Sequence, residues 1–170
     1  MANNYTQASF TILCSQEQAQ MALDAIAYVT DTDVAEGEHL LSKPVSECSL
    51  TELLVLGIIQ NHPECDPFEP TFGQSESPED NYELELKAEI TGKGLAICHD
   101  ESINLDHAIA VTTAVLSVFN LPEMVTINAA FVCDRPRENE FGGATIVVTK
   151  DTHHYEEGFN FSRLMNEAHD

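Results

Sequence analysis

Two histidines and three carboxylates occur within nine residues of one another. They are His99, Asp100, Glu101, Asp106 and His107. Imidazole and carboxylate groups at this spacing can act as a general acid and base, or as metal ligands in a hydrolase. The same residues surround the start of a predicted helix, where acidic side chains complement the helix dipole and Asp100 or Ser102 can cap the helix. We favour this structural interpretation and keep a metal-assisted hydrolase as an alternative.

Other groups with metal-ligand chemistry have weaker spacing. His62 and Cys65 form an H-x-x-C pair, whereas Cys98 and His99 are adjacent and would point to opposite faces of a strand. The acidic run at residues 31–38 lacks the glycine and glutamate positions of a calcium-binding loop. The sequence therefore predicts no metal site and no cofactor.

Motifs for nucleophilic catalysis and phosphate binding are absent from the chain. There is no G-x-S-x-G sequence, no Walker A sequence and no dinucleotide fingerprint. Arg135 and Arg137 lie among acidic neighbours, which favours a local ion-pair cluster over an anchor for a partner's anion. We therefore expect a protein that is not an enzyme.

Net charge is the strongest functional signal. The chain has 29 acidic and 7 basic residues, a net charge of -22 in 170 residues. Its hydrophobic content of 43% is that of an ordinary globular chain, so the acid replaces other surface residues rather than core. With so few basic residues, direct binding to nucleic acid or to an anionic membrane is disfavoured. A basic protein partner is the class that this charge favours.

Two stretches hold most of the candidate contact residues. The first is the acidic run TDTDVAEGE at 30–38, predicted to be a loop, and the second continues from a loop at 63–81 onto a strand. The candidate partner-binding residues are Asp31, Asp33, Glu36, Glu38, Glu76, Glu79, Asp80, Glu83, Glu85 and Glu89.

The elements that would position these residues follow from periodicity and capping signals. Strands are expected at 9–14, 82–90, 95–99, 125–133 and 144–149, and helices at 16–29, 50–61 and 103–119, with a short helix after 159. S-x-x-Q at Ser15 and S-x-x-E at Ser49 are capping boxes that begin the first two helices. His153 and His154 are assigned to a polar loop that faces solvent.

These elements predict a single α+β domain over residues 1–170. We expect a mainly antiparallel sheet with helices packed on one face and an open, acidic opposite face. Similar ILC and AIC strands, followed by helices with DAIA and HAIA, indicate two pseudo-symmetric β-α-β-β halves at about 8–90 and 94–151. The five cysteines have irregular spacing, and the N-terminus has no secretion signal. A reduced, mostly buried set of thiols in a cytoplasmic protein is expected.

The segment CDRPRENEFGGATIVVTKD, residues 133–151, resembles a segment of uncharacterised small acidic proteins of phages and plasmids. The helix with DHA at 106–108 is similar too, so the resemblance covers about residues 95–151. It implies an origin in a mobile element and brings no activity with it.

Acidic charge on a folded scaffold from such a source predicts a nucleic-acid mimic. Duplex DNA carries one charge per about 1.7 Å, so 22 net charges correspond to about 37 Å, or about 11 base pairs. The expected partner is a host defence nuclease of the restriction or CRISPR type, whose basic groove the protein would occupy in the host cytoplasm. The alternative is a soluble structural or regulatory protein, which an even spread of carboxylates would support.

Overall fold

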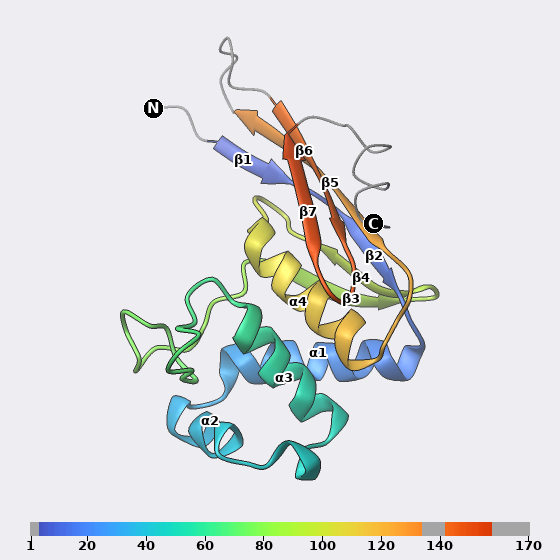
Figure 1. Cartoon of the computed structure of the whole chain (residues 1–170). Coiled ribbons are helices and arrows are strands. Elements are labelled where there is room, and N and C mark those ends of the chain that lie inside the picture. Colours follow the sequence, from blue (N-terminus) through green and yellow to red (C-terminus); the bar gives the residue numbers. More distant parts are fainter. Residues whose placement is uncertain (1–3, 134–141, 158–170) are drawn as a thin grey trace.

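The computed structural model describes residues 4–133 and 142–157, and it has an α+β fold (Figure 1). The helices are α1 (Gln16–Asp31), α2 (Val34–Leu41), α3 (Leu50–Asn61) and α4 (Leu105–Val118), with a short 3-10 helix η1 (Val45–Glu47). The strands are β1 (Asn4–Gln7), β2 (Phe10–Leu13), β3 (Lys87–Thr91), β4 (Gly94–Cys98), β5 (Val125–Cys133), β6 (Gly142–Val148) and β7 (His153–Glu157). The predicted Arg135–Arg137 cluster and the helix after 159 lie outside the described residues.

The strands form two antiparallel sheets rather than the single sheet expected. One sheet has the order β1-β5-β6-β7, and the other has the order β2-β4-β3. Only residues 8 and 9 separate β1 from β2, so the chain passes directly from the first sheet into the second. The proposed boundary between two halves at 90–94 falls in the β3–β4 turn. Because β4 is the central strand of its sheet, that boundary would divide the sheet.

The helices pack in two tiers against the sheets. Helix α1 contacts β3 and β4, and α4 contacts β6, while α3 packs against both α1 and α4 (Figure 1). A continuous core fills these contacts; Ile12, Leu54, Ile58, Leu95 and Ile146 are among its largest fully buried residues. Residues 144–148 of β6 are all buried, so both faces of this strand are covered and the open acidic face expected from the sequence is absent there.

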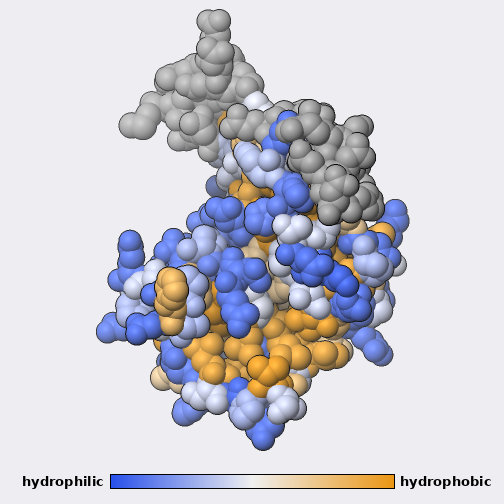
Figure 2. Space-filling view, viewed as in Figure 1, coloured by the Kyte–Doolittle hydropathy of each residue, from blue (hydrophilic) through white to orange (hydrophobic). Residues whose placement is uncertain are grey.

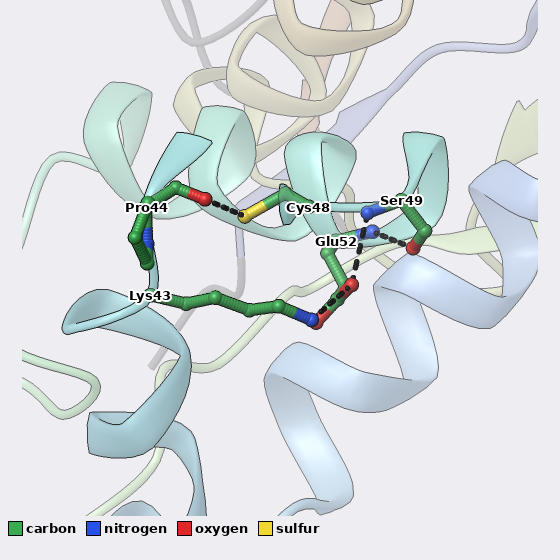
Figure 3. A network of polar contacts seen from close by, with 5 residues as sticks. All are labelled: Lys43, Pro44, Cys48, Ser49 and Glu52. Carbon is green, nitrogen blue, oxygen red and sulfur yellow. Dashed lines mark hydrogen bonds and ion pairs between the residues drawn. The ribbon is translucent and has the colours of Figure 1, made fainter. Parts of the chain in front are cut away.

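Both predicted capping boxes begin helices. The Ser15 hydroxyl accepts the N–H of Gln18 at 3.1 Å, and the Gln18 side chain accepts the N–H of Ser15 at 3.0 Å. Ser49 and Glu52 repeat this arrangement at α3, and the Glu52 carboxylate also pairs with Lys43 at 3.0 Å (Figure 3). Each box satisfies N–H groups that a helix start leaves without partners, which fixes where α1 and α3 begin.

Part of the acidic run predicted to be a loop is helix α2. The Asp33 side chain accepts the N–H of Ala35 at 2.8 Å and caps this helix. Gly37 lowers the helix propensity of the run, but it is buried beneath the ring of Phe72. A tertiary contact that the local sequence does not reveal therefore stabilises the helix.

The predicted strand at 82–90 is strand only from Lys87 onward. Tyr82 and Leu86 are buried while Glu83 and Glu85 are exposed, so the alternation is real. The backbone of this segment, however, bonds to the N-cap of α4 and to the His62 and His107 side chains instead of to another strand; for example, the Asn104 N–H donates to the Glu85 carbonyl at 3.0 Å. Alternation predicted the extended conformation correctly, but it could not predict the bonding partner.

A further correction concerns His153 and His154. These residues begin strand β7, where His153 pairs with Val148 and His154 with Val147 of β6. His153 is exposed as expected, whereas His154 is half-buried.

Candidate partner-binding surface

The two acidic stretches predicted from the sequence meet at one end of the helical layer, although residues 39–62 separate them in the chain. Phe72 makes the central contact. Its backbone N–H donates to the Glu38 carboxylate of α2 at 2.8 Å. Its buried ring packs edge-on against the Tyr28 ring of α1, with the ring centroids 5.6 Å apart. The loop after α3 is therefore attached to both α1 and α2.

A second attachment lies at Asn81. Its side-chain amide donates to the carbonyl oxygens of Thr32 and Val29, which belong to the end of α1 and its connection to α2. Within the loop, the N–H of Gln74 donates to the carbonyl of Asp80 at 2.9 Å, and the Gln74 side chain donates to Asn81 at 3.0 Å. These bonds give the loop a defined conformation beside the helices.

We call the surface formed by residues 31–38 and 64–85 the acidic end. Nine of the ten predicted contact residues lie within these two ranges, as do Glu64, Asp66 and Glu69, which the sequence reasoning missed although they lie in the same acidic loop. Glu89 is separate, since it lies on β3 and lines a different depression with Lys87 and Asp100.

The predicted residues of the acidic end do not all have free carboxylates. Glu38 is half-buried and holds Phe72, and Asp33 caps α2, so both have structural roles. Asp31 ends α1 and accepts a hydrogen bond from the Thr30 hydroxyl at 3.3 Å. The remaining predicted members are exposed: Glu36, Glu76, Glu79, Asp80, Glu83 and Glu85.

Positive charge is scarce around these carboxylates. Residues 30–42 and 61–86 together contain twelve acidic residues and no lysine or arginine. The two ion pairs found in the described part of the chain, Lys43–Glu52 and Lys87–Asp100, lie outside the acidic end. Among the residues that the structure describes, no ion pair neutralises the charge of this surface.

The face formed by α3 has the opposite character. The only charged residue of this helix is Glu52, and Leu50 and the neighbouring Val45 expose 46% and 67% of their surface. Figure 2 shows apolar residues gathered over the helical half of the molecule and hydrophilic residues above and beside them. Other acidic residues, such as Glu17 and Glu123, are exposed elsewhere, but the acidic end holds twelve of the 29 acidic residues of the chain.

The cluster from His99 to His107 does not form one site. His99 Nδ1 accepts the N–H groups of Glu101 and Ser102 at 3.1 and 3.3 Å, and Asp100 pairs with Lys87. The cap of α4 is Asn104, rather than the predicted Asp100 or Ser102. His107 is buried and packs against His62 rather than against these residues, so the geometry does not support the hydrolase alternative.

Instead, His107 stacks on His62, a contact that sequence reasoning did not predict. The centroids of these two rings lie 4.6 Å apart with an interplanar angle of 29°. The Tyr82 ring packs on His62, also with the centroids 4.6 Å apart. The two imidazoles adjoin a cavity of about 140 Å³ whose lining includes Asn104, Glu64, Glu83 and Glu85. Burial lowers the pKa of His62, and burial together with the neighbouring ring lowers the pKa of His107.

This arrangement does not resemble a metal site. Across residues 4–133 and 142–157, no three His, Cys, Asp or Glu side chains are grouped so that they could hold a metal ion. Cys14, Cys48, Cys65 and Cys98 are free thiols, and each is half-buried rather than mostly buried. The His62–Cys65 pair therefore has no converging partners in the described structure.

Comparisons of the chain with protein-family models, with curated proteins and with solved structures found no match. In the described part of the chain, no helix has both the length and the hydropathy required to span a bilayer.

Proposed function

We propose that this protein is a nucleic-acid mimic that binds the basic groove of a host defence nuclease through the acidic end. The observation that supports this proposal is the joining of two cation-free acidic stretches by Phe72 and Asn81. Carboxylates on a disordered tail would have to be ordered when a partner binds, at an entropic cost. Carboxylates on an attached loop and a capped helix avoid most of that cost.

The charge of the acidic end suits a short nucleic-acid segment. At one charge per about 1.7 Å of duplex, its twelve acidic residues correspond to about 20 Å, or about six base pairs. The mechanism is occlusion: the protein fills the groove and nucleic acid cannot enter. Association is expected to be fast at low ionic strength and to slow steeply as salt rises.

The resemblance to proteins of phages and plasmids supports a nuclease of the restriction or CRISPR type as the partner, and the host cytoplasm as the compartment. Such nucleases carry basic grooves that bind duplex DNA, heteroduplex or single strands. No catalytic step by this chain is needed for inhibition by occlusion.

The test is capture from a bacterial host lysate with the tagged full chain at about 50 mM and 500 mM salt. Retained proteins are identified, and each is then purified and its affinity for the chain measured. We expect a nuclease or another nucleic-acid-binding protein that is retained only at low salt. The triple variant Glu76→Gln, Glu79→Gln, Asp80→Asn should bind it about tenfold more weakly, because exposed ion pairs are lost.

A charge-matched control separates a defined surface from general acidity. The variant Glu17→Gln, Glu123→Gln, Asp151→Asn removes the same charge from exposed positions outside the acidic end. We expect the control to bind like the original chain. Equal weakening by both variants would contradict the proposal and support acidity that serves solubility alone.

A further inference from the structure

The buried histidines His62 and His107 hold three backbone groups of the acidic end. His62 Nδ1 accepts the N–H of Glu64 at 3.1 Å, and its Nε2 lies 2.8 Å from the carbonyl oxygen of Glu83. His107 Nδ1 accepts the N–H of Glu85 at 3.0 Å. Through these bonds, the end of α3 and the first turn of α4 hold the backbone at three glutamates whose side chains are exposed.

These contacts require both rings to be neutral. A backbone N–H can only donate, so each Nδ1 must carry its lone pair and each proton must be on Nε2. His62 Nε2–H then donates to the Glu83 carbonyl. An imidazolium carries hydrogen on both nitrogens, so a protonated ring would place its Nδ1–H against the N–H of Glu64 or Glu85. Both Nδ1 bonds would be replaced by a repulsive contact, whereas the Nε2–H of His62 would still donate to the Glu83 carbonyl.

We infer that the His62–His107 pair is a pH-dependent switch: proton uptake releases the backbone amides of Glu64 and Glu85 from the two rings and loosens that part of the acidic end. The release itself follows from the ring contacts. Its consequence, weaker partner binding in acid, rests on the proposed function.

Some groups around the two rings favour their protonation and others oppose it. The titratable groups packed around the two rings are Glu64 and Glu83 near His62, Glu85 and Asp106 near His107, and Tyr82 on His62, with Cys65 beside Tyr82. The four carboxylates favour protonation, whereas burial and the stacked second ring oppose it. Burial raises the pKa of Tyr82, which stays neutral.

The helix ends affect the protonation of the two histidines in opposite ways. His62 caps the C-terminal end of α3, where a positive charge is favourable, and His107 is the third residue of α4, where a positive charge is unfavourable. The helix ends therefore favour the first proton on His62. Once His62 is charged, it opposes protonation of the stacked His107 ring.

The direction of the pH effect follows from the lowered pKa of each histidine. In the unfolded chain both imidazoles titrate near 6.5, and in the folded protein they titrate at lower pH. The stabilising contribution of the neutral rings is therefore complete above about pH 6.5. It is lost as pH falls from there toward the folded pKa values, because the unfolded chain takes up protons first. Each histidine changes the unfolding equilibrium constant by up to about tenfold per pH unit in this range.

NMR of the ¹⁵N-labelled protein tests the required state directly. Two-bond ¹H–¹⁵N spectra should show the Nε2–H tautomer for His62 and His107 at pH 7.5, with both titrating below 6.5. Hydrogen-exchange protection at the amides of Glu64 and Glu85 should fall over the same pH range, after correction for intrinsic exchange. An Nδ1–H tautomer for either ring, or protection unchanged through the titration, would overturn the inference.

Glutamine variants test the contribution of each ring. In His62→Gln and His107→Gln the side-chain oxygen can still accept the backbone N–H, but it does not titrate. Between pH 7.5 and 5.5, each variant should lose less stability in urea unfolding than the original chain, by up to about tenfold in the equilibrium constant per pH unit. His39→Gln, at an exposed position, is the control and should behave like the original chain. If all three variants share the original pH dependence, the switch is wrong.

Neither measurement requires a partner, so failure of the switch and failure of the proposed function are distinguishable. If a glutamine variant does not fold, the spectra of the unaltered protein still decide the tautomers and protection. If the spectra agree with the switch but the acidic end captures no basic protein, the proposed function is wrong and the switch remains.

Discussion

The ring of Phe72 occupies the space that a Cβ atom at Gly37 would need, and this contact joins the loop after α3 to helix α2. Phe72 is fully buried, and its N–H bonds to Glu38 one residue further along the helix. Glycine is a poor helix former, but at this position any side chain would overlap the ring. The close approach of α2 to the loop therefore depends on Gly37.

We predict that Gly37→Ala destabilises the protein by about 1–3 kcal/mol, the usual cost of overpacking a core. The gain in helix propensity offsets only part of that cost. Urea unfolding measures the change. Adding Phe72→Leu should give a total loss smaller than the sum of the single changes, because the overlap is relieved. Strict additivity would show that the two residues are not in contact.

The β3–β4 turn offers a matched pair of glycines. Gly94 has φ of +143°, and a Cβ there would overlap the carbonyl oxygen of Ile12, whereas a Cβ at Gly92 would meet nothing within 4 Å. We expect Gly94→Ala to lower the free energy of unfolding by about 1–3 kcal/mol or more. Gly92→Ala should be neutral or stabilising by up to about 1 kcal/mol. Thermal unfolding of both variants measures the contrast, and a similar effect at the two positions would contradict this account of the turn.

Local signals in the sequence predicted several elements correctly. The capping boxes at Ser15 and Ser49 begin α1 and α3 as expected, and α3 has the predicted bounds. The α+β class and the buried positions 82 and 86 were also predicted. These features depend on residues a few positions apart, which periodicity and capping patterns detect.

Features that depend on distant residues could not be predicted in this way. The sequence suggested a loop where Gly37 forms part of α2, because the supporting Phe72 is 35 residues away. The sequence suggested pairing His62 with Cys65 and His107 with His99. In the structure, His62 and His107 pack on each other. The sequence listed most carboxylates of the acidic end, but only the contacts of Phe72 and Asn81 place the two stretches side by side.

The most direct test of the central claim is competition between this protein and nucleic acid for the captured nuclease. The affinity of the nuclease for a fluorescently labelled duplex is measured at increasing concentrations of the full chain. We predict that the apparent Kd for the duplex rises in proportion to the concentration of the chain, with the same final signal at saturating nuclease. A ternary complex of duplex, nuclease and chain, with duplex affinity unchanged, would contradict the claim that the acidic end occupies the groove.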